Sequence, residues 1–338
     1  MRTEYNGRVN SVYDLTKFML SIFVIMIHTN FFPQYLFPWL RTAVPIFFML
    51  SSYLLFSKLS KIPDIGEKNT ALKKFIKRNL SLYAFWFIAL LPFTVKIKKW
   101  FTDDSMFENI RIIVKGILFG STFRASWFIT ALVIAVVIVF FMSKKLSSRS
   151  ILLISLLIYG MVCLRSGYLP ILNQNETVKS FIIFYEKYFS TPYNSFPAAL
   201  FWVACGKAFA EKTFNTKTKT AVFFTVISAV LLFAECQLSY TLTKSIKNDC
   251  YFMLVPLCIS LFCIIINIKP FTLSFSVILR KSSTIIYAFH ATVATLVLNQ
   301  IKTAEPLFII TLGITLSVAA VIILLEKYRP FKWLKYSY

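Results

Sequence analysis

The chain contains only two histidines, His28 and His290, and both lie in stretches apolar enough to cross a membrane. An ionisable side chain at membrane depth is costly, so it is usually retained because it faces a cavity or a partner. A neutral imidazole can take up a proton near pH 7 and return it. Each histidine is therefore a candidate for acid–base chemistry. The alternative is a neutral ring that only bridges two helices by hydrogen bonds.

Asp14 and Lys17 precede His28 on the same predicted helix. At about 100° per residue, the step from Lys17 to His28 leaves an offset of only about 20°, so these side chains share a face. They stand roughly 16 Å apart along the axis, too far for a direct hydrogen bond. The geometry fits a long ligand, such as an acyl-CoA, with its anionic end at Lys17 and its reactive end at His28. Alternatively, Asp14 and Lys17 form an ordinary ion pair at the helix start.

A second polar group accompanies the other histidine. Ser283, Tyr287 and His290 are spaced by four and then three positions, which places them on one face of a predicted helix. They either orient a donor or an acceptor, or they form a polar seam between packed helices.

The elements that must position these residues are membrane helices. The 338 residues are 57% hydrophobic and only 15% charged, and apolar runs of spanning length recur along nearly the whole sequence. We expect a single all-α polytopic membrane domain over residues 1–338, with about ten transmembrane helices; nine or eleven remain open. The predicted spans centre near Val24, Leu50, Phe87, Val136, Leu157, Val203, Ile227, Leu261, Ala291 and Val318.

The net charge of +23 reflects topology and not nucleic-acid binding, because Lys and Arg concentrate between the apolar runs. Seven basic residues lie between Lys58 and Arg78 alone. The positive-inside rule then predicts that both termini are cytoplasmic, with a short basic tail from about residue 326.

Two long outer loops are expected, at about 96–126 and 165–195. The second is rich in Tyr and Asn, which suits a sugar or an interfacial aromatic belt. The six cysteines lack metal-like spacing, so no metal is expected.

These residues carry a resemblance. Asp14-Leu15-Thr16-Lys17, His28 after ten more residues, and the segment from Val44 to Tyr53 look like the opening of the acyltransferase-3 family. The family's order continues with the basic stretch Lys73 to Arg78, the start Ser126-Trp127-Phe128, the segment from Phe196 to Gly206, and Ser283 to His290. The resemblance covers about residues 11 to 295.

The resemblance implies a ten-helix enzyme of the bacterial cytoplasmic membrane that moves an acyl group, often acetyl, from cytoplasmic acyl-CoA to a hydroxyl of a surface polysaccharide or related glycan. His28 matches the catalytic histidine. Lys17 stands where the family commonly has Arg. Lysine keeps the positive charge but cannot donate the two parallel hydrogen bonds of a guanidinium. Ser52 stands where Gly is common. On this basis we expect the donor at Lys17, Asp14 and Arg78, and substrate contacts at Trp127, Ser283, Tyr287 and His290.

Acyl transfer to a hydroxyl needs a base and a means of stabilising the oxyanion. His28 is the predicted base, although a covalent acyl-histidine is the alternative. A competing hypothesis is an exporter of a polysaccharide or a lipid-linked sugar, which would move glycan without consuming acyl-CoA. The sequence leaves open the acceptor, the choice between acetyl, succinyl and other acyl groups, and the oligomeric state.

Overall fold

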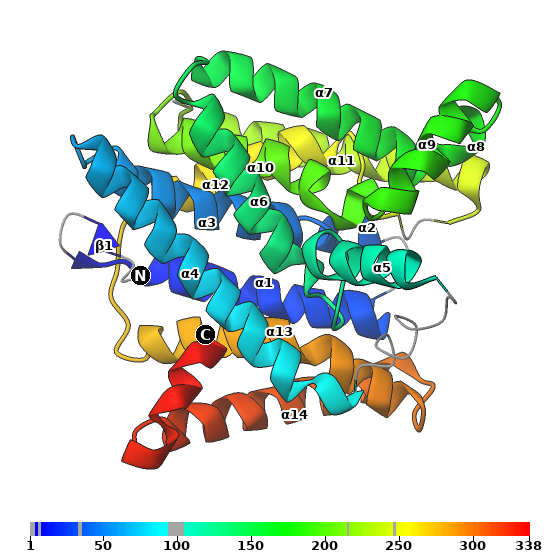
Figure 1. The fold of residues 1–338 in the computed structure, drawn as a ribbon. Helices are drawn as coiled ribbons and strands as arrows, with labels where there is room; N and C mark the ends of the chain where they lie inside the picture. The colour runs from blue at the N-terminus through cyan, green and yellow to red at the C-terminus, as the bar shows by residue number, and fades with distance from the viewer. Residues whose placement is uncertain (1–3, 6–7, 33–35, 94–104, 215, 246–247) are drawn as a thin grey trace.

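The computed structural model describes residues 4–5, 8–32, 36–93, 105–214, 216–245 and 248–338. The described chain is almost entirely helical, apart from a short antiparallel hairpin formed by β1 (Glu4–Tyr5) and β2 (Arg8–Val9). Its longer helices are packed into a bundle (Figure 1). They are α1 (Ser11–Thr29), α3 (Ala43–Leu59), α4 (Ile65–Ala89), α6 (Trp127–Met142), α7 (Ser148–Gly167), α10 (Phe196–Ala210), α11 (Thr218–Thr243), α12 (Leu254–Asn267), α13 (Ser276–Leu298) and α14 (Ala304–Leu325).

Shorter elements connect these helices. They are α2 (Phe37–Leu40), η2 (Leu91–Phe93), α5 (Met106–Leu118), α8 (Leu169–Leu172), α9 (Glu176–Tyr188), η4 (Pro192–Asn194) and η5 (Arg329–Ser337). The expected outer loop 165–195 thus contains two helices and a 3-10 turn. Of the other expected loop, residues 94–104 lie outside the described part of the chain.

All ten predicted span centres fall within helices. Among the described residues, five helical stretches are long and apolar enough to cross a membrane: Ser11–Thr29, Phe37–Leu59, Ser148–Gly167, Thr218–Thr243 and Ala304–Leu325. The helices α6, α10 and α12 are apolar but shorter, whereas α4 and α13 carry charged residues inside their lengths. The membrane character of the chain is therefore supported, while the exact number of spans stays a prediction.

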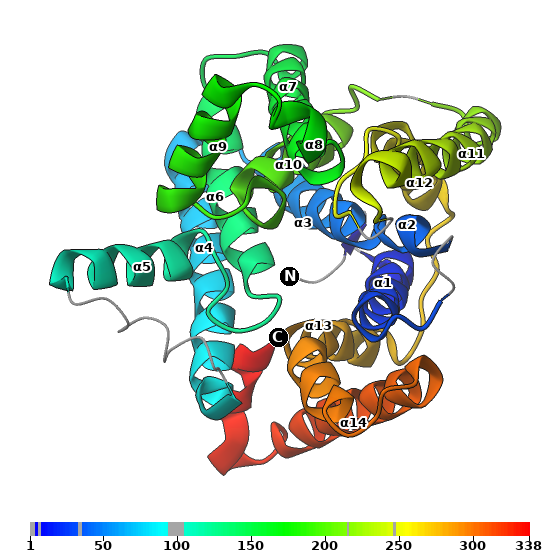
Figure 2. The same cartoon turned by 90° about the vertical axis from the view of Figure 1, so that its right-hand side faces the viewer.

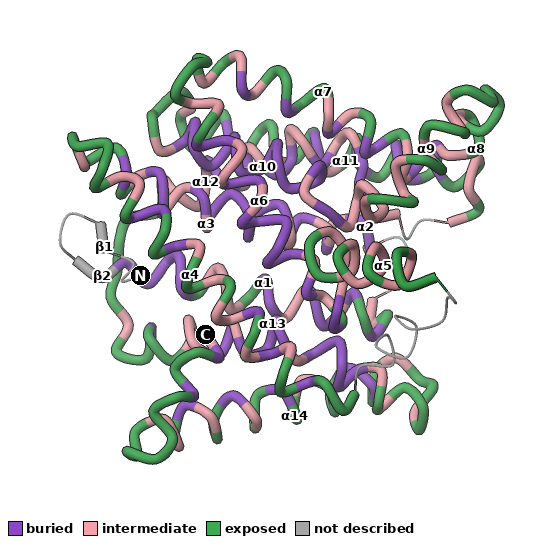
Figure 3. Tube along the Cα trace, viewed as in Figure 1, coloured by how far each residue is buried: buried purple, intermediate pink, exposed green. Residues whose placement is uncertain are grey.

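The core lies around α10, which is buried on nearly all sides and packs most extensively against α3, α6 and α7 (Figure 3). By contrast, α11 and α14 expose many apolar side chains, among them Phe223 and Ile309. Exposed apolar surface on helices of spanning length is what lipid contact requires. The bundle therefore has an apolar outside and a tightly packed centre.

Helix starts are fixed by local capping. Asn10 accepts from the backbone of Val12 at the start of α1, and Asp64 accepts from Glu67 N at the start of α4. The expected tail is folded back rather than extended: it forms η5, and Trp86 Nε1 donates to the carbonyl of Ser337 over 3.0 Å. The C-terminal segment thus covers α4, beside α13 and α14 (Figure 2).

Candidate active site

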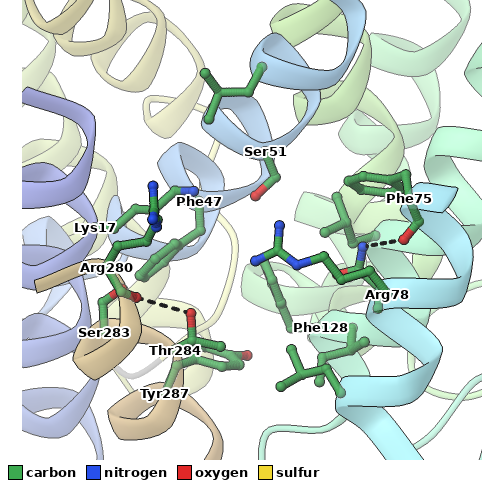
Figure 4. Close-up of a pocket in the computed structure, with 15 residues that line it drawn as sticks. Lys17, Phe47, Ser51, Phe75, Arg78, Phe128, Arg280, Ser283, Thr284 and Tyr287 are labelled. Atoms are coloured by element: carbon green, nitrogen blue, oxygen red, sulfur yellow. Dashed lines mark hydrogen bonds between the residues drawn. The ribbon is translucent and has the colours of Figure 1, made fainter. Parts of the chain in front are cut away.

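Three cations converge on one cavity. Lys17 from α1, Arg78 from α4 and Arg280 from α13 line a space of about 120 Å³. Lys17 and Arg280 reach in from one side and Arg78 from the other (Figure 4). Their neighbours in the wall include hydroxyl groups and aromatic rings. These further lining residues are Phe47, Ser51, Leu54, Phe75, Asn79, Leu82, Phe128, Ile129, Leu132, Ser283, Thr284 and Tyr287.

The start of α1 is tied to the start of α13. Asp14 is completely buried, and its carboxylate accepts a 2.5 Å hydrogen bond from Ser276 Oγ. The same oxygen, Oδ2, lies 4.0 Å from Nη1 of Arg280. One turn earlier, Ser11 Oγ accepts from the backbone of Leu273 over 2.8 Å. These bonds fix the two helix starts side by side and hold Arg280 near Lys17.

The two helices also meet about four turns later. The rings of His28 on α1 and His290 on α13 lie with centroids 5.0 Å apart. The Asp14–Ser276 contact precedes the His28–His290 contact on both helices, so α1 and α13 run parallel along one line of contact, called the seam below. Along this seam, Arg280 in the cavity wall and His290 in the pair stand about 15 Å apart.

The two histidines differ in their surroundings. His290 is fully buried, and its Nδ1 lies 2.9 Å from the carbonyl of Ile286 and 2.7 Å from that of Tyr287. Because carbonyls only accept, Nδ1 of His290 carries the proton. Its Nε2 has no hydrogen-bond partner among the described residues. His28, in contrast, is exposed. The exposed ring is the one that can meet a substrate.

Tyr287 connects the cavity with the histidine pair. Its ring lines the cavity and lies 6.0 Å from the ring of His290. It also packs against Phe47 and Phe128, with centroids 5.8 and 5.1 Å away. Its hydroxyl donates to the carbonyl of Ala125 over 3.1 Å. Aromatic side chains thus form the boundary between the cationic cavity and the rest of the seam.

The structure brings together most of the predicted site residues. Lys17, Arg78, Ser283 and Tyr287 line the cavity, and His28 and His290 form the pair beyond it. Asp14 does not line the cavity and instead bonds to Ser276. Their roles toward a ligand remain predictions.

Trp127 lies apart from the cation cavity. It lines a smaller cavity of about 40 Å³ together with Arg41, Asp249, Tyr193 and Trp202.

Among the residues that the structure describes, no group of three His, Cys, Asp or Glu side chains is arranged to hold a metal ion.

Sequence reasoning missed Arg280. Its signal was present, because Arg280 precedes Ser283 by three positions and Tyr287 by seven, and so shares their helix face.

Comparison with known proteins identifies the family. The acyltransferase domain family, acyltransferase-3, matches residues 10–326. The chain therefore belongs to this family of acyltransferase domains.

Two curated relatives, both named amino-acid racemase and both from Enterococcus faecalis, are similar to parts of the chain. One is 28% identical over 208 residues, which are 57% of this chain and 27% of the relative. The other is 23% identical over 277 residues, which are 78% of this chain and 38% of the relative. The chain thus spans well under half the length of these relatives. No solved structure matches it.

Proposed function

We propose that this protein is a membrane-bound O-acyltransferase that moves an acyl group, most simply acetyl, from cytoplasmic acyl-CoA to a hydroxyl of a cell-surface polysaccharide or related glycan. The observation that carries the proposal is the seam between α1 and α13, which joins a cavity lined by Lys17, Arg78 and Arg280 to the His28–His290 pair. An acyl-CoA has a polyanionic head and a distant reactive thioester. The cation cavity matches the head, and the histidine pair matches the reactive end.

The cavity supplies the donor end. Three cations around about 120 Å³ repel one another, with the Asp14 carboxylate nearby at 4.0 Å from Arg280. Phosphate groups would offset this repulsion, and the two guanidinium groups would hold them with paired hydrogen bonds. Lys17 adds a point charge. Serine and threonine hydroxyls in the same wall provide further donors.

The histidine pair supplies the reactive end. His28 takes the proton of the attacking hydroxyl as the new ester bond forms, and it returns that proton to the departing thiolate. His290, protonated on Nδ1 and fully buried, packs against His28 and keeps its ring in place. Direct transfer of this kind needs no covalent acyl-enzyme.

The family membership and the apolar helices support the proposed acceptor class and membrane location. A glycan acceptor, an acetyl donor and the bacterial cytoplasmic membrane are the expectations that the acyltransferase-3 resemblance brings. The racemase name belongs to proteins more than twice as long as the segment they share with this chain. Racemisation is therefore not extended to this chain.

A purified-protein assay tests the proposal. Wild-type protein with acetyl-CoA and an envelope glycan extract should release free CoA thiol and yield glycan heavier by one acetyl group in mass spectrometry. His28→Gln should abolish both signals, because Gln keeps the polar bulk of the ring and cannot shuttle a proton.

Expression, membrane insertion and monodispersity of His28→Gln should stay near wild type. Retention of most activity by this variant would make His28 structural and refute the mechanism. Glycan movement across vesicles without consumption of acetyl-CoA would instead favour an exporter.

A further inference from the structure

The loop between α5 and α6, residues 119–126, is held rigidly beside the seam. Its Thr122 and Ser126 are fully buried, and the backbone of Thr122 donates to Ser126 Oγ over 3.0 Å. The hydroxyls of Thr122 and Tyr83 lie 2.7 Å apart, which ties the loop to α4. A loop with this many internal and external bonds has one preferred conformation.

Within this loop, Ala125 has a φ of 65°. The left-handed region is unfavourable for a residue with a Cβ, and such strain persists only where the surroundings impose it. Here the carbonyl of Ala125 accepts the hydroxyl of Tyr287 over 3.1 Å. The helix that carries His290 therefore also fixes the loop, and the strained residue directly follows Arg124.

Arg124 is the exposed cation of this loop. The loop meets the histidine pair through Tyr287, whose hydroxyl binds Ala125 and whose ring lies 6.0 Å from that of His290, which in turn lies 5.0 Å from that of His28. Both Arg124 and Arg41 interact electrostatically with the His28 ring. Arg41 is paired with Asp249 at 2.5 Å, so its charge is compensated. Arg124 makes no hydrogen bond or ion pair with the residues that the structure describes. A guanidinium that no described residue pairs is thus held near the exposed histidine on a strained, anchored loop.

We propose that Arg124 is a catalytic residue that binds the oxyanion formed during acyl transfer at His28. This inference rests on the function proposed above. The acceptor hydroxyl attacks the thioester carbonyl, its proton passes to His28, and the carbonyl electron pair moves onto the oxygen that faces Arg124. When the C–S bond breaks, its electron pair leaves on sulfur, which takes the proton from His28 as free CoA forms. Preorganised cations at a developing oxyanion are strongly stabilising.

The test uses the purified full chain with acetyl-CoA and measures thiol release both to the glycan acceptor and to water. Arg124→Gln should lower kcat on the order of 100-fold for both reactions while leaving the KM for acetyl-CoA near wild type. Arg124→Lys should recover part of the lost kcat, because lysine keeps the positive charge but lacks the planar guanidinium with its paired hydrogen-bond donors. Arg149→Gln is the matched control, since Arg149 is an exposed arginine at the start of α7, and it should leave both rates unchanged.

Two outcomes of Arg124→Gln would overturn the inference. One is wild-type rates of hydrolysis and transfer in this variant while His28→Gln is inactive, which leaves the proposed function standing. The other is a rise in KM for acetyl-CoA at unchanged kcat, which would make Arg124 a donor-binding residue. If Arg124→Gln loses thermal stability, a stable Arg124→Lys variant is measured instead: a kcat lowered at intact KM supports the inference, and a wild-type kcat contradicts it. Wild-type protein that consumes no acetyl-CoA would refute the function itself.

Discussion

Lys17 and His28 lie on one face of α1 and have different roles in the proposed function. Lys17 lines the cation cavity, whereas His28 lies about three turns further along and contacts His290. A phosphate-binding cation interacts with the donor equally in the ground state and the transition state, because the phosphates do not take part in the reaction. A proton-transferring group acts only as the bond forms. The two residues should therefore give different kinetic signatures.

Lys17→Ala should raise the KM for acyl-CoA on the order of 10-fold, the loss expected from one charged hydrogen bond, with kcat changed much less. Steady-state kinetics of thiol release on the purified protein measure both constants. Lys61→Ala is a suitable control, because Lys61 is exposed beyond the end of α3. A fall in kcat at unchanged KM would place Lys17 in the chemistry instead.

Arg280 shows how a charge is kept inside a membrane protein. It lies on the same side of the cavity as Lys17 and faces Arg78, and the carboxylate of Asp14, fixed by Ser276, stands 4.0 Å from it. The buried carboxylate offsets part of this charge. In the proposed function we therefore assign Asp14 a positioning role, through Arg280, and not direct contact with the donor.

At the scale of elements, the crossing of α3 and α10 depends on small residues. Gly206 faces Ser52, and a Cβ at position 206 would overlap Ser52 Oγ and the carbonyl oxygen of Met49. Ser52, which stands where the family commonly has Gly, is completely buried at this crossing, so only a small side chain fits there. Since α10 is the centre of the core, this contact positions α3 and with it the cavity wall at Phe47 and Ser51.

Gly206→Ala should destabilise the protein by about 1–3 kcal/mol, because backbone atoms of α3 cannot rotate away and the helices must separate. Thermal unfolding in detergent measures the change. Gly313→Ala in α14 is the matched control: no atom lies within 4 Å of a Cβ there, so the change should be neutral or stabilising by up to about 1 kcal/mol. Equal melting temperatures for the two variants would contradict the proposed close packing.

At the scale of the molecule, the parallel direction of α1 and α13 restricts the topology. Successive spans alternate in direction, so helices that run the same way through a membrane have an odd number of spans between them. The ten-span prediction makes α1 the first span and α13 the ninth, with seven between them, which satisfies this condition. A count that drops or adds one span between them does not.

Single cysteine tags in a background without the six native cysteines test this topology. A tag at Lys144, between α6 and α7, should react only with reagent on the cytoplasmic side. A tag at Gln174, between α8 and α9, should react only from outside. Labelling of Gln174 from the cytoplasmic side alone would overturn both the orientation and the proposed entry of acyl-CoA at Lys17.

Hydropathy and the distribution of Lys and Arg along the sequence suffice to predict the class of protein, because they record the cost of placing each residue in a bilayer. The two histidines were found as polar groups inside apolar segments, and helical periodicity related Lys17 to His28, and Ser283 and Tyr287 to His290. Arg78 was proposed only from the resemblance to the acyltransferase-3 family. Hydropathy was least decisive for assigning membrane spans at α4 and α13, because Arg78 and Arg280, which line the cavity, interrupt the apolar pattern there.

Which of these residues lie in contact could be learned only from the packing of the helices. Periodicity along one helix gives the face of a side chain but not the partner helix, and the α1–α13 contacts join residues 262 positions apart, as in Asp14 and Ser276. The same holds for the strained loop at Ala125, whose conformation depends on the hydroxyl of Tyr287 from a distant helix. Arg124 became a candidate for this reason, because only long-range packing, which no local pattern encodes, brings its charge to the seam. Helical spacing gives the face on which Arg280 lies, but its position beside Lys17 also depends on that packing.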